Sequence, residues 1–370
     1  MIGERIIGID ARELEGKPTG VGVYLKGILQ ELQIPPHTRL QLYFRNSVPK
    51  NVSNINAEMI VLKTSNSNIA WQQWTLCREL ANRNVNLFFS PANSLPWRFS
   101  GIQTLTVHDL SFYRYPFWFT AKERLSRQIN TCQSIRSADR VYTVSEFVKK
   151  EILQRFNIKE ERIKVTPNGV SQCEPDFTMR NVLRETRRLA NSKIILYTGS
   201  IFNRRHLPLL IAALSHLAPE YVLIIVGENR TFPKIDLEQE AEKIGVRNRV
   251  QILQYLPDHL LQEYYIMADV FVYLSEYEGF GIPPLEAMCY RLPVIISDTP
   301  AMNTIYRDSA YFVPSFSPQA VADAIKKVLE DETEKSRLID AGREMAARYN
   351  WRETARIISS DWEQLLDSAG

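Results

Sequence analysis

Cysteine and histidine are scarce in this chain of 370 residues, which contains four cysteines and five histidines. No Cys-x-x-Cys pair and no Asp-x-Asp occur, and the four cysteines lie far apart, at Cys77, Cys132, Cys173 and Cys289. Closely spaced ligands are the usual signature of a zinc site or of a disulfide framework. We therefore expect no metal site and no disulfide framework, and this cysteine usage is typical of a reducing cytosol.

Long hydrophobic runs are also missing. No apolar stretch reaches the roughly 18–20 residues needed to span a bilayer, and the chain opens with a strand-like run at Ile6–Ile9 rather than with a signal peptide. We expect a cytoplasmic protein that is soluble or peripheral at the inner face of the membrane.

Charge is balanced over the whole chain, at +3, but not along it. Residues 1–170 contain 23 Lys and Arg against 14 Asp and Glu, whereas residues 171–370 contain 22 against 28. A basic half favours association with an anionic surface, although charge scattered over both faces explains the same numbers.

Strand-like and amphipathic helical segments alternate throughout, which indicates an α/β fold with parallel sheets in two domains. Two sets of five strands are predicted, separated by a polar stretch: Ile6–Ile9, Gln41–Phe44, Leu87–Phe89, Thr104–Val107 and Arg140–Thr143, then Ile194–Thr198, Tyr221–Val226, Val250–Leu253, Val270–Leu274 and Val294–Ile296. We place an N-terminal domain at 1–171, a linker at 172–192, a C-terminal domain at 193–350 and a final helical segment at 351–370.

The stretch 275–288 is the most informative one, because it places Glu278 and Glu286 on either side of a Gly279-Phe280-Gly281 turn. It follows a buried strand, and the two prolines after the turn suit the first turn of a helix. Free backbone N–H groups and the helix dipole favour anionic or oxygen-rich ligands there. A dipole partner and an ordinary turn are the structural alternatives, and the residues alone leave both readings open.

Other polar groups also follow predicted strands. Ser200, Arg204 and Arg205 come after the first strand of the second set, where guanidinium groups suit phosphate oxygens, although exposed arginines are often merely solvated. His108 ends a strand of the first set, and Gly20 and Gly22 form a short Gly-x-Gly loop. A single histidine and a bare Gly-x-Gly are weak signals by themselves.

Read together, these motifs resemble the retaining family-four glycosyltransferases, the group 1 type with a GT-B fold. The resemblance rests on the Glu-(seven residues)-Glu run at 275–288, the Thr-Gly-Val-Gly-x-Tyr loop at 19–24, the His-Asp pair at 108–109 and the Arg-Arg pair at 204–205. It implies two Rossmann-like domains that face each other across a deep cleft, with the C-terminal helix returning to the first domain.

The family resemblance also implies roles for these residues. It gives the catalytic set as His108, Glu278, Arg204 and Arg205, with His108 beside the transferred sugar and both arginines on the leaving diphosphate. It gives donor binding to Gly20, Gly22, Ser200, Glu228, Gly279, Phe280, Gly281 and Glu286, with no metal and no cofactor other than the nucleotide-sugar.

The chain departs from the family pattern at a few positions. Arg205 replaces a lysine in the phosphate motif, and Arg291 stands where the family commonly has glycine. Neither departure removes a residue that the resemblance assigns to chemistry.

The implied function is transfer of a hexose, with GDP-mannose favoured over UDP-sugars, to a glycan or a polyprenyl-diphosphate-linked acceptor in bacterial surface polysaccharide (lipopolysaccharide) synthesis. No nucleic-acid partner is expected. A non-catalytic sugar-nucleotide-binding partner of another transferase, and an epimerase on the same fold, are the alternatives.

Overall fold

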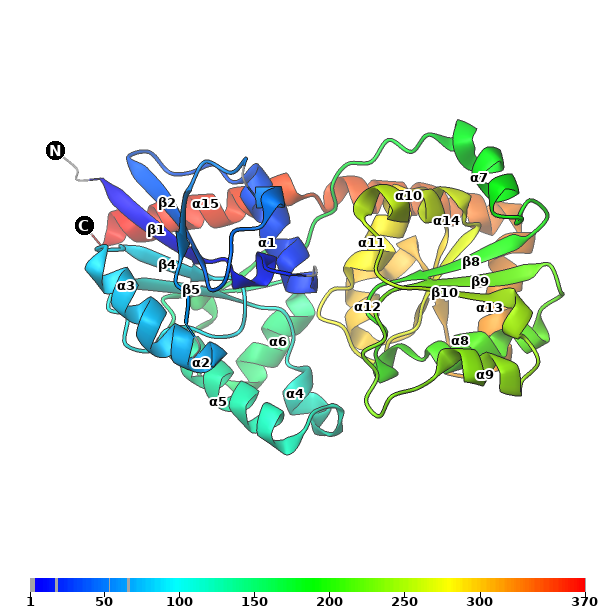
Figure 1. Cartoon of the computed structure of the whole chain (residues 1–370), viewed down its shortest axis with the longest axis horizontal. Coiled ribbons are helices and arrows are strands. Elements are labelled where there is room, and N and C mark those ends of the chain that lie inside the picture. The colour runs from blue at the N-terminus through cyan, green and yellow to red at the C-terminus, as the bar shows by residue number, and fades with distance from the viewer. Residues whose placement is uncertain (1–3, 17–18, 53, 65–66, 370) are drawn as a thin grey trace. The chain divides into compact units, whose positions relative to one another are not determined.

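The structure, a computed structural model, describes residues 4–16, 19–52, 54–64 and 67–369. The chain divides into two compact units, Met1–Ser171 with Asn350–Gly370, and Gln172–Tyr349. Each unit is built on one fully parallel sheet with helices on both of its faces (Figure 1). The α/β class predicted from the alternating pattern is therefore confirmed.

The first sheet has the strand order β3-β2-β1-β4-β5-β6-β7 and the second β10-β9-β8-β11-β12-β13. All ten predicted strands are present, together with three short strands at sheet edges that the sequence did not indicate: β3, β7 and β13. The strands are β1 (Arg5–Asp10), β2 (Thr38–Phe44), β3 (Glu58–Val61), β4 (Leu87–Ser90), β5 (Ile102–Val107), β6 (Arg140–Thr143), β7 (Ile163–Val165), β8 (Lys193–Thr198), β9 (Tyr221–Val226), β10 (Val250–Leu253), β11 (Val270–Tyr273), β12 (Val294–Ser297) and β13 (Tyr311–Val313).

Helices follow most strands and complete the layers. They are α1 (Gly20–Glu31), α2 (Asn68–Ala70), α3 (Cys77–Asn82), α4 (Ser111–Arg114), α5 (Ala121–Ser137), α6 (Glu146–Arg155), α7 (Arg180–Thr186), α8 (Leu207–Ala213), α9 (Leu237–Lys243), α10 (Asp258–Met267), α11 (Ile282–Cys289), α12 (Pro300–Tyr306), α13 (Pro318–Glu330), α14 (Glu332–Arg348) and α15 (Trp351–Ser368). In the second unit α8 and α9 cover one face of the sheet, and α10 and α14 cover the other (Figure 1).

The strand order fixes where a ligand can bind. In each sheet the order reverses between the first strand of the unit and its neighbour, at β1/β4 and at β8/β11. In open parallel sheets the connections leave in opposite directions at such a point, so a crevice opens at the carboxyl ends of the two strands. The loops after β8 and β11 carry the arginine pair and Glu278, which places both motifs at one switch point.

The last helix, α15, belongs to the first unit. Gly27 of α1 allows its close approach, because a Cβ at that position would lie 2.3 Å from the Trp351 ring. Farther along α15, the buried Trp362 packs with its ring centroid 5.3 Å from that of Phe89. Burial of such a large aromatic surface holds the helix against the first sheet.

A buried carboxylate adds a polar contact to this helix. Asp361 accepts hydrogen bonds from Arg140 Nε at 2.9 Å and from the Tyr142 hydroxyl at 2.8 Å, and its other oxygen pairs with Lys164. Since the Asp361 side chain is fully buried, these cations compensate a charge that has no access to water.

The segment 172–192, predicted as a linker, contains α7 and lies within the second unit. Arg180 and Arg184 both pair with Asp269, which directly precedes β11, and so tie α7 to that unit. One disulfide, between Cys173 and Cys289, is present although the scattered cysteines predicted no disulfide framework. Their separation of 116 residues carries no local signal, and only the packed fold brings them together.

Among the described residues, no helix is both long and apolar enough to cross a bilayer.

Candidate active site

The loop after β8 brings Arg205 into the second unit's interior. Gly199, with φ +113°, turns the chain there, and a Cβ at this position would lie 3.0 Å from Arg205 Nη1. Glycine is thus required both for the backbone conformation and for the close approach of the guanidinium. Gly227 of the neighbouring loop is equally constrained, since its Cβ would lie 2.0 Å from the Gly199 carbonyl oxygen.

Arg205 is held on several sides. Its Nε donates to Glu278 Oε1 at 3.0 Å, and its Nη1 donates to the Ser200 carbonyl at 2.7 Å. The guanidinium carbon lies 4.9 Å from the centroid of the Tyr273 ring. Burial opposes the charge of Arg205, but Glu278 and the neighbouring tyrosines raise its pKa well above the ordinary value. The guanidinium is therefore fixed in place before any ligand arrives.

Glu278 completes this pair from the loop after β11. It also accepts hydrogen bonds from the Tyr273 hydroxyl and from Ser275 Oγ, each at 3.0 Å. Burial alone would raise its pKa, but Arg205 and Arg204, together with the hydrogen bonds from Arg205 and Ser275, hold the pKa below its ordinary value. Glu278 is consequently a carboxylate at neutral pH.

The turn after Glu278 leads into α11, whose start has the predicted form. Gly281 is the N-cap residue in a left-handed conformation (φ 87°), and prolines occupy the first turn. Gly281 offers no side chain to cap the helix. Because Pro283 and Pro284 have no N–H, the backbone donors that can face ligand oxygen atoms at this helix start are those of the turn and of Ile282. Phe280 is different, because its ring is buried with its centroid 5.5 Å from that of Tyr349. Only its backbone can reach a ligand.

Glu286 lies one turn farther along α11. It accepts a hydrogen bond from the Tyr265 hydroxyl at 2.9 Å, and that hydroxyl is also 2.7 Å from Thr198 Oγ1 at the end of β8. Burial raises the pKa of Glu286, and the hydrogen bond from Tyr265 offsets this only in part. The two carboxyl groups of the motif thus differ, one held ionised by arginines and the other beside a phenol.

Arg204 and Glu228 are half-buried and lie on the loops after β8 and β9. The Arg204 guanidinium carbon lies 4.4 Å from the centroid of the Phe202 ring. Glu228, after β9, pairs with Arg230 at 2.6 Å, with both side chains about one third exposed. Arg230 was not singled out from the sequence, and nothing in its local pattern distinguishes it.

In the first unit, the turn after β5 fixes His108. Its Nε2 lies 2.7 Å from the Pro91 carbonyl oxygen, and its ring meets that of Tyr24 edge-on at 4.8 Å between centroids. A carbonyl can only accept, so Nε2 carries the proton and Nδ1 is left as an acceptor. Burial lowers the pKa of His108, which makes the neutral form dominant at pH 7. Asp109 braces the turn, because Ser111 donates to it through both N and Oγ.

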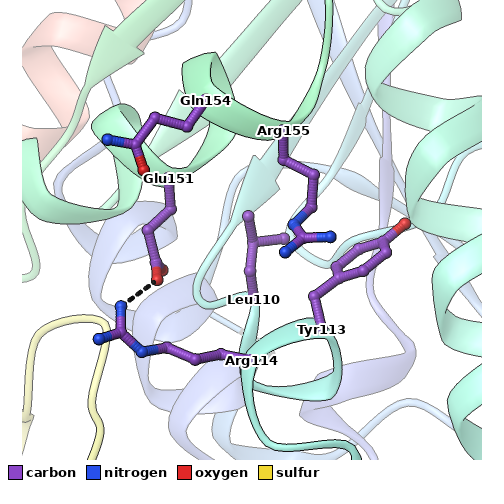
Figure 2. Close-up of a pocket in the computed structure, with 6 residues that line it drawn as sticks. All are labelled: Leu110, Tyr113, Arg114, Glu151, Gln154 and Arg155. Carbon is purple, nitrogen blue, oxygen red and sulfur yellow. Dashed lines mark hydrogen bonds and ion pairs between the residues drawn. The ribbon is translucent and has the colours of Figure 1, made fainter.

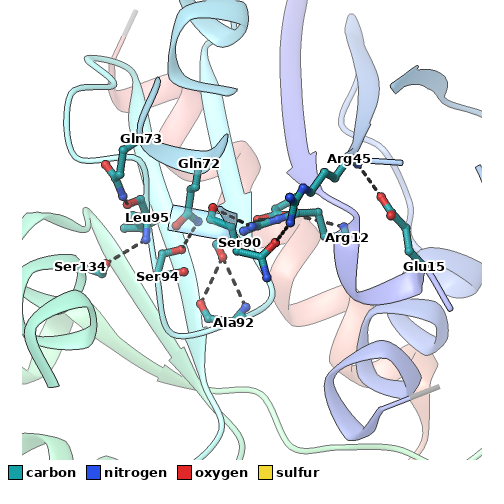
Figure 3. Close-up of polar contacts among 12 residues, drawn as sticks. Arg12, Glu15, Arg45, Gln72, Gln73, Ser90, Ala92, Ser94, Leu95 and Ser134 are labelled. Carbon is teal, nitrogen blue, oxygen red and sulfur yellow. Dashed lines mark hydrogen bonds and ion pairs between the residues drawn. The ribbon is translucent and has the colours of Figure 1, made fainter. Parts of the chain in front are cut away.

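The loop that carries Pro91 is held by residues that the sequence did not indicate. Gln72 and Gln73 lie on a π-helical segment, Trp71–Leu76, and donate to the carbonyls of Ser94 and Leu95. Figure 3 shows these side chains around the loop, where Ser134 Oγ also accepts from the Leu95 N–H at 2.8 Å. Polar side chains buried in a π-helix are a feature of functional regions, but the sequence carries no mark of it.

The glycines of the N-terminal loop have different surroundings. Thr19 caps α1 by accepting from the Gly22 N–H at 3.0 Å, and a Cβ on Gly22 would lie 2.4 Å from the Glu13 carbonyl oxygen. Packing therefore accounts for the glycine at position 22. Gly20 has open space where a Cβ would be, so it is the one with room for a ligand.

The structure thus brings the predicted residues together in two groups. In the second unit, Arg205 contacts both Glu278 and Ser200, and the 279–281 turn follows Glu278 directly. In the first unit, His108 contacts Tyr24 of the helix that Gly20 begins. Each group lies at the carboxyl ends of its strands.

These features agree with two family models. Residues 35–172 match the model described as Glycosyltransferase Family 4, and residues 180–345 match Glycosyl transferases group 1. The chain therefore belongs to the family-four, group 1 type glycosyltransferases, as the motifs predicted.

Among curated proteins, the chain is 28% identical over 274 residues to the O-antigen chain mannosyltransferase B of Escherichia coli, which covers 72% of this chain and 71% of that protein. It is 30% identical over 226 residues to the O-antigen chain mannosyltransferase RfbU of Salmonella typhimurium, which covers 61% of this chain and 60% of that relative.

Solved structures share the fold at lower identity. Anabaena Alr3699/HepE, solved with UDP and glucose, aligns with a TM-score of 0.79 and 18% identity over 97% of this chain and 99% of that chain. WaaG, a glycosyltransferase involved in lipopolysaccharide biosynthesis, aligns with a TM-score of 0.75 and 17% identity over 96% and 99%. The predicted GT-B class, with two Rossmann-like domains, is confirmed.

Proposed function

We propose that this protein is a retaining hexosyltransferase that uses a nucleotide-sugar donor, with GDP-mannose favoured. The observation that carries the proposal is the buried Arg205–Glu278 pair beside the uncapped start of α11 at a sheet switch point. Negative charge develops on the leaving diphosphate during transfer, and fixed donors and cations at that position stabilise it most effectively.

In this reaction the arginines and the backbone N–H groups of the 279–281 turn receive the diphosphate. Glu278, which is ionised and prepositioned, accepts hydrogen bonds from the donor sugar, and Glu286 accepts them from the ribose. His108 presents a neutral imidazole to the sugar. No side chain is assigned as a covalent nucleophile, in line with same-face substitution.

The mannose preference is supported by the two O-antigen mannosyltransferases that the chain resembles. The names of these relatives also support an O-antigen or lipopolysaccharide glycan as acceptor, free or on a polyprenyl-diphosphate carrier. UDP-sugars are the alternative donors, because HepE was solved with UDP.

The donor is tested by thermal shift with GDP-mannose, UDP-glucose, UDP-N-acetylglucosamine, GDP and UDP. A ligand at one hundred times its Kd stabilises the folded state by about 2.7 kcal/mol, so binding is readily seen. Glu286→Gln should lower the shift given by the preferred nucleotide, whereas Glu363→Gln, on the exposed face of α15, should leave it unchanged. No shift with any nucleotide would refute the donor assignment.

The reaction products distinguish a transferase from the two alternative functions. Slow donor hydrolysis that releases mannose in the donor's own anomeric configuration supports a retaining transferase. Binding without hydrolysis or transfer, even with a lipopolysaccharide acceptor fraction, would favour a non-catalytic partner of another transferase. Appearance of an epimeric nucleotide-sugar would favour an epimerase.

We also propose that the protein works in the cytoplasm, at the inner face of the membrane. The basic composition of the first half supports this. Lys150→Glu is the informative charge reversal, because Lys149 is already paired with Glu160 at 2.8 Å. Unchanged sedimentation with vesicles of anionic phospholipid would count against membrane association.

A further inference from the structure

A cavity in the first unit lies beside the turn that carries His108. It has a volume of about 420 Å³ and is lined by Leu110, Tyr113, Arg114, Glu151, Gln154 and Arg155 (Figure 2). This is within the range of roughly 300–1,000 Å³ that is typical of small-molecule sites. Leu110 follows His108 by two residues, so their Cα atoms are separated by at most about 7.6 Å.

The walls of this cavity come from α4 and α6 and carry an excess of positive charge. Arg114 forms an ion pair with Glu151 at 3.2 Å, and these two charges offset each other. Arg155 packs on the opposite wall, with its guanidinium carbon 4.5 Å from the centroid of the Tyr113 ring. Figure 2 shows Arg155 beside Tyr113, apart from the Arg114–Glu151 pair.

Arg155 and Gln154 are exposed at the mouth of the cavity, and within the described parts of the chain no protein group accepts or donates a hydrogen bond to their side chains. No carboxylate there forms an ion pair with Arg155, and Gln154 makes no hydrogen bond. Stacking on Tyr113 orients the guanidinium plane and leaves its N–H edges for a ligand.

We propose that this cavity binds a phosphate-type oxyanion of the acceptor, with Arg155 and Gln154 as its main contacts. A planar guanidinium donates two parallel hydrogen bonds to such a group, and a neighbouring amide N–H adds a third. That the ligand is the acceptor rests on the proposed function. The site would then place the acceptor's anionic group next to the turn that holds His108.

Hydrogen exchange of the whole protein tests the proposal, because it locates binding along the chain. The probes are inorganic pyrophosphate and farnesyl diphosphate, given to the wild type, Arg155→Gln and Lys159→Gln. Lys159 is exposed just beyond α6 and does not line the cavity, so its variant carries the same charge change. Gln154→Glu is a second variant, which adds repulsion without removing any packing.

Pyrophosphate should protect peptides from residues 109–115 and 147–156 in the wild type and in Lys159→Gln. Both cavity variants should bind at least about tenfold more weakly, the loss of one charged contact. Tighter binding of farnesyl diphosphate than of pyrophosphate would identify a lipid-linked phosphate, and equal binding would identify the anion alone. Absence of protection in these peptides, or equal protection in Arg155→Gln, would overturn the proposal.

Failure of the proposed function would look different. Protection of residues 198–206 by GDP or UDP reports binding at the nucleotide site of the second unit. If pyrophosphate still protects the cavity peptides but neither nucleotide protects residues 198–206, the donor assignment fails and the cavity proposal stands.

Discussion

Removal of Arg205 is predicted to destabilise the second unit, because Glu278 would be left buried and charged. Both side chains are only about one tenth exposed, and the bond between them measures 3.0 Å. Loss of one partner from a buried pair costs about 3–5 kcal/mol. Arg205→Met keeps most of the apolar stem and should therefore lower the unfolding free energy of this unit by that amount, or about 10 °C in Tm.

The two units can be followed separately in one unfolding experiment. All six tryptophans lie in the first unit, at Trp71, Trp74, Trp97, Trp118, Trp351 and Trp362. Tryptophan emission in urea therefore reports the first unit, and far-ultraviolet circular dichroism reports both. In Arg205→Met the emission transition should stay in place while part of the dichroism transition moves to lower urea.

The charge origin of the effect is tested in two ways. Arg205→Met with Glu278→Gln removes both charges and should recover about 2 kcal/mol, without restoring transfer. In the wild type the pKa of Glu278 is lower in the folded than in the unfolded state. The ionised Glu278 therefore stabilises the folded state fully above about pH 4.3, the pKa in the unfolded state, and this stabilisation is lost as the pH falls through the folded pKa. Without Arg205, burial raises that pKa, so the stability gap should narrow from pH 7 to pH 4. Equal stability of Arg205→Met and wild type at pH 7, or no rescue by Glu278→Gln, would refute this reasoning.

Three further outcomes are expected. Arg291→Gly should stabilise the protein by about 1 kcal/mol in urea titration, because Arg291 has φ 57° just after α11, where glycine avoids the steric cost. A loss of stability in this variant would mean that the contact of the Arg291 guanidinium with the Phe177 ring is worth more than the steric cost. Asp361→Asn should lower the stability reported by tryptophan emission by about 3 kcal/mol, while Glu363→Gln, which is exposed on the same helix, should change it by less than about 0.5 kcal/mol. Thiol titration of the unfolded, unreduced protein should find two free cysteines rather than four.

Strong local patterns in the sequence predicted most of this fold. Continuous apolar runs such as Tyr221–Val226 belong to central strands, where burial on both faces demands them. The strands that were missed lie at sheet edges and have three or four residues with little burial, as in Glu58–Val61. An edge strand needs few apolar residues, so its sequence resembles that of a loop.

The candidate site divides in the same way. Residues with a local signature, such as Gly281 before a proline pair, were found at the predicted place. Partners chosen by tertiary packing were not. The contacts of Gln72 and Gln73 with the loop after β4, and the bond between Cys173 and Cys289, depend on which segments meet in the folded chain. Periodicity and motif spacing carry no information on those pairs.

The charges around Glu278 lead to one more prediction. Two arginines and one carboxylate give this cluster a net charge of +1, and a diphosphate that binds there approaches Glu278 as well as the arginines. Glu278→Gln removes a like charge from the neighbourhood of the phosphates and leaves Arg205 without its buried counter-charge. A nucleoside diphosphate should therefore bind this variant more tightly, by about 2 kcal/mol, which is the interaction of two unit charges roughly 8 Å apart at the effective dielectric constant of roughly 20 that applies to such sites.

Transfer by the same variant should fall, because the sugar loses its carboxylate acceptor. Calorimetric titration of GDP and UDP, with Ser315→Ala as a variant at an exposed and uncharged position, measures the affinity change. Tighter product binding with slower transfer separates attraction of the phosphates from recognition of the sugar. Weaker binding of the diphosphate by Glu278→Gln would instead show that Glu278 serves mainly to hold Arg205 in its binding geometry, and the charge argument would fail.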